Sequence, residues 1–293
     1  EICAECGLPD GVLNLVTGQG AVTGQALGLH GDVDVLVFTG SGFVGRKLME
    51  YSARSNLKRL YLELGGKSPN VVFADAPDLK QAARVSAGGI FRNSGQVCVA
   101  GSRLLVERAI HEEFTELIAA EARAFKVGNP LKLDTDIGAV SSEAHLSKVA
   151  GFVDTTLKEG ATLMTGGERL LAQTGGSYFA PTVFTGVTPD MTLSRDEVFG
   201  PVLAITPFDS EDEAVALANG TYYGLAAGVW TGNLSRAHRM VSAINAGVVH
   251  VNTYGGPDVT VPLGGHKQSG NGHDKSLHAM DKYVNLKTAW IQL

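Results

Sequence analysis

Two kinds of hydrophobic pattern alternate along this chain: short apolar runs, and longer segments in which apolar residues recur at helical spacing. The short runs predict strands at 33–40, 59–66, 70–76, 103–107, 201–208, 226–232 and 248–252. The longer segments predict helices at 43–53, 78–93, 111–125, 143–160, 211–220 and 234–247. Because strands separated by helix-length segments form βαβ units, the pattern predicts an α/β fold with a mostly parallel sheet.

The last 39 residues of the chain depart from this alternation. Residues 255–272 (GGPDVTVPLGGHKQSGNG) are rich in glycine and proline and predict a long loop. Loops of this length usually carry function or are disordered. Residues 282–293 (KYVNLKTAWIQL) alternate toward a strand. We expect so apolar a terminal strand to join a sheet, either in its own subunit or in a partner's.

Length, net charge and cysteine count limit the domain organisation, the partners and the compartment that the chain favours. The 293 residues suit two packed domains or one large one. A net charge of −6 without a basic stripe argues against nucleic acid and anionic membranes as partners. The absence of a membrane-length apolar run and of a signal peptide, with an odd count of three cysteines, favours the cytoplasm. The chain starts at Glu1, inside a pattern typical of a helix end, so we expect it to be a fragment.

Two spacings resemble known motifs but do not satisfy them. Cys3 and Cys6 form a C-x-x-C pair, yet no second pair completes a zinc site, so we interpret them as small residues one helical turn apart and expect no metal. Gly18, Gly20 and Gly24 resemble a dinucleotide fingerprint. The third glycine comes one residue late and the acidic residue expected about 20 positions later is not convincingly placed, so we predict a turn before a helix.

A better candidate for phosphate binding lies at 38–45 (FTGSGFVG). This segment follows a predicted strand and opens a predicted helix. The N–H groups and the dipole of a helix N-terminus favour a pyrophosphate, and Ser41 adds a hydroxyl. The motif alone is weak evidence, because glycine is common at any turn between a strand and a helix.

Glu63 ends an apolar strand, just before Gly65, Gly66 and Lys67. A carboxylate at that place faces desolvation, which raises its pKa toward that of a usable general base. Two other interpretations stay open at this point: a solvated residue at a strand end, and an ion pair between Glu63 and Lys67.

Cys98 stands among small and amide-bearing residues in NSGQVCVAGSR (93–103). Gly95 lets the backbone pass without a side chain, so that the Cys98 N–H can face a pocket and donate to an oxyanion. A thiolate in an accessible polar turn is a nucleophile, whereas a thiol in an apolar core is inert. The local sequence leaves both the catalytic thiol and the small buried thiol open.

Taken together, these segments resemble the aldehyde dehydrogenase superfamily. The matching motifs, in the family's order and spacing, are FTGS-x-x-x-G (38–45), LELGGKSPNVVFADA-x-x-D (62–78), GQVCVAGSR (95–103), EVFGPV (197–202) and PLGGHKQSGNG (262–272). The resemblance covers essentially the whole chain. Residues 266–293 look most like the bacterial gamma-glutamyl-gamma-aminobutyraldehyde dehydrogenase group of putrescine catabolism, which handles several ω-amino aldehydes.

The resemblance implies an aldehyde dehydrogenase fold with three parts. These are the C-terminal remnant of a Rossmann-type NAD(P)-binding domain (1–65), a complete α/β catalytic thiol domain (66–268) and a C-terminal arm with an oligomerisation strand (269–293). It implies Cys98 as the nucleophile and Glu63 as the general base. The cofactor residues it implies are Gly40, Ser41 and Gly45 at the pyrophosphate, Glu197 at the nicotinamide ribose and Phe199 beside the nicotinamide.

The same resemblance implies the partners. The cofactor is NAD or NADP, with NAD favoured, the substrate is a small-molecule aldehyde, and the full-length protein is a homodimer or homotetramer. The family carries a long section before residue 1, which supplies an oxyanion-hole Asn, a Lys for the adenosine ribose, the first Rossmann strands and an oligomerisation hairpin. Without that section, we expect the 293 residues neither to bind cofactor well nor to oxidise aldehydes alone.

Two positions bear on the substrate. Leu263 stands where relatives often carry Phe near the aldehyde channel, which implies a wider or less aromatic pocket. Asp258, in the loop before Pro262, either attracts a cationic or amino-bearing aldehyde or is a solvated loop residue.

Three other functions are weighed against the leading one. A non-catalytic truncated paralogue would fold against a partner subunit, although the intact Glu63 and Cys98 argue against it. A thiol hydrolase needs a His oriented toward Cys98, and none of the eight His lies in a recognisable partner motif. A CoA-acylating relative would not need Glu63 to activate water.

Overall fold

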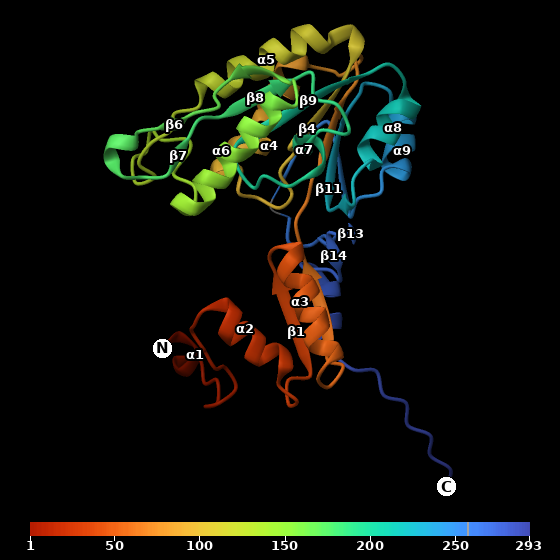
Figure 1. Cartoon of the computed structure of the whole chain (residues 1–293). Coiled ribbons are helices and arrows are strands. Elements are labelled where there is room, and N and C mark those ends of the chain that lie inside the picture. Colours follow the sequence, from red (N-terminus) through yellow and green to blue (C-terminus); the bar gives the residue numbers. More distant parts are fainter. Residues whose placement is uncertain (257) are drawn as a thin grey trace.

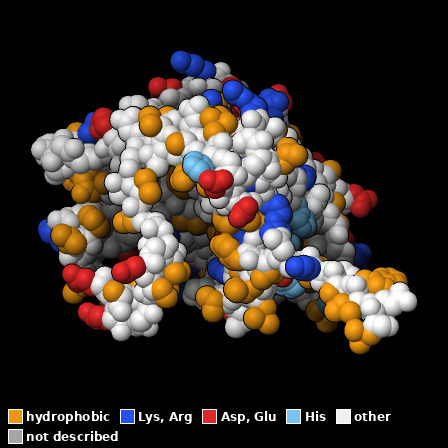
Figure 2. Space-filling view, turned by 90° about the horizontal axis from the view of Figure 1, so that it is seen from below, with side chains coloured by type: hydrophobic (Ala, Val, Ile, Leu, Met, Phe, Trp, Pro, Cys, Tyr) orange, Lys and Arg blue, Asp and Glu red, His pale blue; other side chains and the backbone are white. Residues whose placement is uncertain are grey.

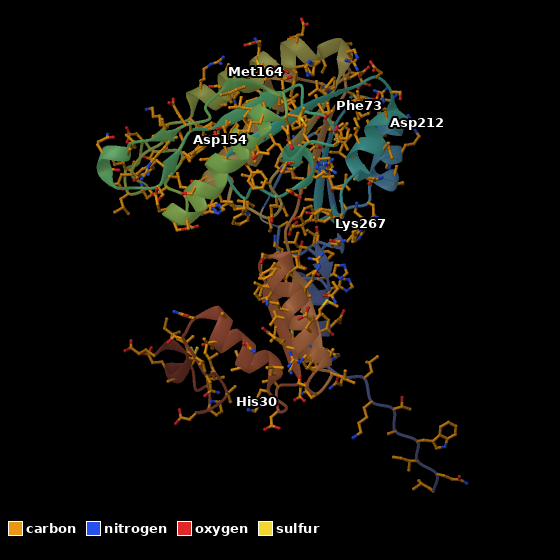
Figure 3. The ribbon with its side chains drawn as sticks, viewed as in Figure 1. His30, Phe73, Asp154, Met164, Asp212 and Lys267 are labelled. Carbon is orange, nitrogen blue, oxygen red and sulfur yellow. The ribbon has the colours of Figure 1, made fainter. Side chains whose placement is uncertain are left out.

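Two units, each built around its own sheet, make up the computed structural model, which describes residues 1–256 and 258–293 (Figure 1). The larger unit holds a seven-stranded sheet and the smaller one a three-stranded sheet. Figure 3 places Lys267 between the two units and His30 at the far end of the smaller one. Pro257, within the predicted loop at 255–272, lies outside the described residues.

The large sheet has the order β12-β11-β3-β4-β9-β8-β5. Its strands are β3 (Pro69–Val72), β4 (Arg103–Glu107), β5 (Thr162–Thr165), β8 (Thr182–Thr185), β9 (Val202–Phe208), β11 (Ala226–Trp230) and β12 (Val248–Val251). Every neighbouring pair is parallel except β5 with β8. The predicted α/β fold with a mostly parallel sheet is therefore confirmed. The alternation of the chain missed β5 and β8, which lie between the helix at 143–160 and the strand at 201–208.

Helices cover both faces of this sheet. They are α4 (Leu79–Phe91), α5 (His111–Ala124), α6 (Glu143–Lys158), α7 (Thr192–Arg195), α8 (Glu211–Asn219) and α9 (Leu234–Ala243). Successive strand side chains point to opposite faces. Val72 accordingly packs in the core cluster of α4 and α5, whereas Val71 packs in that of α8 and α9. Burial on both faces explains why the strands read as continuous apolar runs.

The smaller unit surrounds the sheet β1-β2-β14. Its elements are α1 (Ile2–Glu5), α2 (Gly20–Leu29), β1 (Val35–Thr39), α3 (Gly42–Ala53), β2 (Arg59–Glu63) and β14 (Gly270–Asn271). β1 and β2 are parallel, and β14 pairs antiparallel with β2 so that Gly270 faces Glu63. α2 begins at Gly20, which confirms the turn before a helix predicted there. The pairing of β14 brings the predicted loop at 255–272 against Glu63.

Short elements complete the description. They are the strands β6 (Arg169–Leu170), β7 (Tyr178–Phe179), β10 (Tyr223–Gly224) and β13 (His266–Lys267), and the 3₁₀ helices at Arg92–Gly95, Arg108–Ile110, Ala172–Thr174 and Leu277–Tyr283. Within the described residues, no helix has the length and apolar character needed to cross a bilayer.

The predicted strand at 282–293 is not formed in this single chain. Residues up to Tyr283 belong to a 3₁₀ helix, and the tail beyond it has neither helix nor strand assigned and extends away from the body (Figure 1). A strand needs a neighbouring strand for its backbone N–H and C=O groups, and among the described residues none pairs with the tail, whose Val284 carbonyl accepts only from the Arg59 side chain. Leu286, Trp290 and Leu293 are fully or almost fully exposed. The view from below in Figure 2 shows many hydrophobic side chains on that face of the molecule.

Candidate active site

One cavity of about 570 Å³ gathers six of the seven residues that the resemblance assigned to the site. They are Gly40, Ser41, Glu63, Cys98, Glu197 and Phe199, and the same cavity is lined by Thr39, Asn93, Gln96, His145 and Lys148 among others. Their positions range over about 160 residues of sequence, from the end of β1 to the segment before β9. The fold therefore brings a thiol, two carboxyls and a helix N-terminus together.

The turn before Cys98 has a backbone that explains its small residues. Asn93, Ser94 and Gly95 all have positive φ, of 52°, 56° and 68°. A Cβ on Gly95 would lie 2.1 Å from the carbonyl oxygen of Gly200, so only glycine fits there. The Ser94 hydroxyl donates to the Gly138 carbonyl at 2.8 Å and holds this turn to the loop after α5.

Tyr254 fixes the chain directly after the thiol. Its hydroxyl donates to the Val99 carbonyl at 2.8 Å. Its ring lies so close to Gly89, Gly101 and Gly228 that a Cβ on any of them would come within 3.0 Å of it. No motif predicts this contact, because a lone tyrosine and three glycines far apart in the chain form no recognisable pattern.

The Cys98 thiol is half-buried, and burial raises its pKa above the ordinary value. The backbone N–H groups of Val99 and Cys98 oppose this rise, while the carboxyls of Glu197 and Glu63 add to it. The local sequence left an accessible thiolate and a buried thiol open, and the half-buried thiol with its raised pKa lies between these two interpretations. Such a thiol needs a base to become a nucleophile.

Glu63 has the environment of such a base. It is 7% exposed, and its Oε1 has no hydrogen-bond partner among the described residues. Burial, reinforced by the charge of Asp274 and opposed by that of Lys282, raises its pKa to about 7. Lys282 is itself buried and forms an ion pair with Asp274. The solvated strand end considered from the sequence is therefore wrong.

The other alternative, an ion pair between Glu63 and Lys67, is absent from the described part of the chain as well. Lys67 is 1% exposed and its ammonium has no hydrogen-bond partner there. Burial and the nearby Arg103 lower the pKa of Lys67 to about 7, against the pull of Glu197 and Asp196. Lys67 does not line the Cys98 cavity.

The N-terminus of α3 opens onto the same cavity. Ser41 caps this 12-residue helix by accepting the Val44 N–H at 3.3 Å, which leaves its own hydroxyl proton free to be donated. Thr39 and Gly40 lie at the carboxyl end of β1, where ligands bind in open α/β sheets. A helix N-terminus beside a cavity of this size fits the pyrophosphate of a dinucleotide.

Gly45 does not line this cavity. It is buried in α3, where a Cβ would lie 2.9 Å from the side chain of Leu64, so its lack of a side chain lets the helix pack on the end of β2. It lines a separate cavity of about 290 Å³ beside Arg46 and Lys267. Its assignment to the pyrophosphate stays a prediction.

Glu197 lies against the Gly65–Gly66 turn. Its Oε1 accepts the Gly66 N–H at 3.0 Å. A Cβ on Gly65 would come within 2.2 Å of its Oε2, so Gly65 makes room for the carboxylate. Burial raises the pKa of Glu197, and the Gly66 hydrogen bond opposes the rise. Phe199 follows with a positive φ of 56° and a partly exposed ring.

A second cavity, of about 520 Å³, has Val99, the residue after Cys98, in its wall. Its walls are mostly apolar and include Leu263. Asp258 and Lys275 bring opposite charges to it. The Asp258 carboxylate accepts hydrogen bonds from the N–H and hydroxyl of Thr260, which lower its pKa.

Metal ligands are not grouped in the described residues: nowhere do three His, Cys, Asp or Glu side chains lie together in a way that would hold an ion. Cys3 lies in α1 and Cys6 directly follows it, and both are exposed and free.

The model of the aldehyde dehydrogenase family matches residues 1–289. The chain belongs to the aldehyde dehydrogenase family. Among curated relatives, it is 51% identical over 292 residues to the NADP/NAD-dependent aldehyde dehydrogenase PuuC of Escherichia coli, covering all of this chain and 58% of PuuC.

Two solved aldehyde dehydrogenases show the same fold. The indole-3-acetaldehyde dehydrogenase AldA of P. syringae, in complex with NAD+ and IAA, has a TM-score of 0.98 and 50% identity, over all of this chain and 59% of AldA. The gamma-glutamyl-gamma-aminobutyraldehyde dehydrogenase of Burkholderia cenocepacia has a TM-score of 0.95 and 52% identity, over 98% of this chain and 58% of that one. This aldehyde dehydrogenase chain therefore spans somewhat more than half the length of its relatives.

Proposed function

We propose that the full-length protein, meaning this chain with any section that precedes it, oxidises an aldehyde to the carboxylic acid with NAD or NADP. The observation that carries this proposal is the shared cavity, in which the Cys98 thiol, the Glu63 carboxyl and the N-terminus of α3 meet. The family supports the reaction type. The printed names of the relatives support the cofactor, since PuuC is NADP/NAD-dependent and AldA was solved with NAD+.

The proposed mechanism uses Cys98 twice. The Cys98 thiol releases its proton to solvent, and the thiolate adds to the aldehyde carbon to give a thiohemiacetal. The backbone N–H groups beside the sulfur stabilise the oxyanion. When the oxyanion collapses, the hydride leaves and a Cys98 thioester remains. NAD(P), when bound, supplies the hydride acceptor.

Glu63 then acts on the thioester. It takes a proton from water, the hydroxide adds to the thioester carbon, and the thiolate leaves as the carboxylic acid forms. Glu63 and Cys98 line the same cavity, which a base that activates water toward the thioester requires. Glu197 and Phe199 are proposed to orient the nicotinamide side of the cofactor, and Gly40, Ser41 and Gly45 to bind its pyrophosphate.

For the substrate, we propose an ω-amino or gamma-glutamylamino aldehyde of polyamine catabolism. The second cavity supports this choice, since apolar walls suit the alkyl stem while Asp258 and Lys275 offer one charge of each sign to its far end. A gamma-glutamylamino aldehyde carries both an ammonium and a carboxylate there, whereas an ω-amino aldehyde carries only the ammonium. The relative from B. cenocepacia bears the name of the glutamylated aldehyde.

Substrate preference tests this choice. In the full-length protein, Lys275→Met should lower kcat/KM for the gamma-glutamylated aldehyde about five-fold relative to 4-aminobutyraldehyde, since a solvated ion pair contributes up to about 1 kcal/mol. Lys287→Met, in the exposed tail, is the matched control. An unchanged ratio, or a wild-type preference for a neutral aromatic aldehyde, would contradict the proposal.

Each of the three competing functions requires a different structural or chemical observation. For a thiol hydrolase, His145 is the histidine in the Cys98 cavity, but its Nε2 lies 2.6 Å from the Phe199 carbonyl oxygen and is engaged there. A non-catalytic paralogue would show no aldehyde-dependent formation of NADH or NADPH. A CoA-acylating enzyme would release an acyl-CoA, which mass spectrometry distinguishes from the acid. We further propose a cytoplasmic homodimer or homotetramer, in which the tail at 284–293 pairs with a sheet of another copy.

A further inference from the structure

Helix α6 presents two polar side chains, one turn apart, to the segment that carries Glu197 and Phe199. His145 Nε2 lies 2.6 Å from the carbonyl oxygen of Phe199. Lys148 Nζ donates to the carbonyl of Glu197 at 3.4 Å. Both side chains line the Cys98 cavity, and neither was singled out by the sequence motifs. This contact therefore ties a helix of the large unit to the segment proposed to orient the cofactor.

The contact with α6 matters because the backbone of Phe199 has an unfavourable conformation. Its φ of 56° lies in the left-handed region, which costs a residue with a bulky side chain about 1–2 kcal/mol. Strain of this kind persists only where the surroundings hold the backbone in place. Gly200, directly after it, packs so tightly on α6 that a Cβ would lie 2.6 Å from Val149. The backbone at 199–200 is thus held against α6 from two sides.

The His145 contact has a defined chemistry. A carbonyl oxygen only accepts, so Nε2 must carry a hydrogen, as it does in the Nε2–H tautomer and in the imidazolium. The imidazole also meets the Phe199 ring edge to face, with the centroids 6.1 Å apart and an interplanar angle of 69°. One side chain therefore holds both the backbone and the ring of Phe199. Lys148 is exposed and its contact is longer, so it holds the segment less firmly.

We propose that His145 is a positioning residue for hydride transfer, which fixes the left-handed Phe199 and thereby the Glu197 carboxylate and the Phe199 ring in the cavity. The inference rests on the proposed function, because it concerns the cofactor side of that site. In this role His145 acts through Phe199 and does not contact a reacting atom. The step that forms the Cys98 thioester from an activated ester needs no cofactor and so does not depend on His145.

The test compares His145→Leu, which fills similar space without a donor, with His145→Gln, which keeps an N–H donor. In the full-length protein, His145→Leu should slow the pre-steady-state formation of NADH or NADPH at least about ten-fold, since a misplacement of about 1 Å can cost on the order of 100-fold. Acylation of Cys98 by p-nitrophenyl acetate should stay within about two-fold, and His145→Gln should recover most of the lost rate. His238→Leu, at an exposed position on α9, is the matched control.

A readout without turnover separates this inference from the proposed function. A crystal structure of His145→Leu should show Phe199 released from its positive φ, with the Glu197 carboxylate displaced. An unchanged Phe199 backbone, or an equal loss of both rates, would overturn the role of His145. If the wild-type protein forms no NADH or NADPH from any aldehyde, the proposed function fails, while the structural result still decides whether His145 holds Phe199.

Discussion

The most discriminating perturbation is Glu63→Gln, because it changes stability and catalysis through the same proton. The pKa of Glu63 lies at about 7 in the folded chain, against 4.5 for an ordinary glutamate. The folded state therefore holds this proton more tightly than the unfolded state does. Stability is lost as the pH rises from about 4.5 through about 7, because the buried carboxyl must then ionise in the fold.

The interval between the two pKa values corresponds to about 3 kcal/mol. Glutamine cannot ionise, so Glu63→Gln removes this penalty at high pH. The free energy of unfolding of the variant, minus that of the wild type, should rise by up to about 3 kcal/mol between about pH 4.5 and pH 8. A buried amide without partners adds a constant cost, which shifts the whole curve but not its slope. Groups that do not interact with Glu63 titrate equally in both proteins and cancel.

Urea unfolding of both proteins at several pH values gives this difference directly. Glu168→Gln, at an exposed position, is the matched control and should give a flat difference curve. A flat curve for Glu63→Gln as well would mean that Glu63 titrates as an ordinary carboxylate, and its role as a base near neutral pH would be refuted. A curve that falls with pH would place the pKa of Glu63 below its usual value.

The remaining predictions concern rates and the Cys98 turn. In the full-length protein, Glu63→Gln should keep a pre-steady-state burst of NADH or NADPH but slow the steady rate by about 100-fold or more; a slowed burst would assign Glu63 mainly to the thiol proton. Glu197→Gln should slow hydride transfer up to about 100-fold and leave acylation by an activated ester intact, and equal losses would indicate a folding defect. Gly95→Ala should lower the free energy of unfolding by at least about 2 kcal/mol, because its methyl would meet Gly200, and a neutral result in urea unfolding would show that the turn relaxes. Lys282→Met should move the pH profile of the steady rate upward by at least about half a pH unit, because Lys282 lowers the pKa of Glu63; a downward shift would contradict this electrostatic account.

The sequence predicted those parts of the fold that depend on local pattern. Most strands and helices of the large unit followed from apolar runs and helical spacing, since central strands such as β3 and β11 are buried along their whole length. The sequence pattern missed β5 and β8. The strand predicted at 282–293 was wrong, because a local pattern does not show whether a neighbouring strand is present. Its alternation is real, but a strand exists only with a neighbouring strand to share its hydrogen bonds, and none of the described residues forms one beside it.

For the site, the sequence predicted residues within motifs and missed those that act through contacts. Cys98 and Glu63 carry their signal in the adjacent glycines, which the structure explains by steric clash and turn geometry at Gly95. His145 and Tyr254 form hydrogen bonds with main-chain carbonyls. Every residue has such a carbonyl, so the residue type of the partner does not reveal the contact. Nor does spacing reveal that Cys98 is buried enough to keep its proton, since desolvation comes from residues distant in sequence.

A thioester at Cys98 is the intermediate that the proposed reaction requires. Full-length Glu63→Gln protein, incubated with the aldehyde and NAD or NADP, then quenched in acid and digested, should yield the peptide containing Cys98 with the mass of one added acyl group. The acyl group should be absent without cofactor, because the thiohemiacetal becomes a thioester only when hydride leaves. An acyl group on another residue, or turnover that persists in Cys98→Ala, would contradict the assignment of Cys98 as the nucleophile.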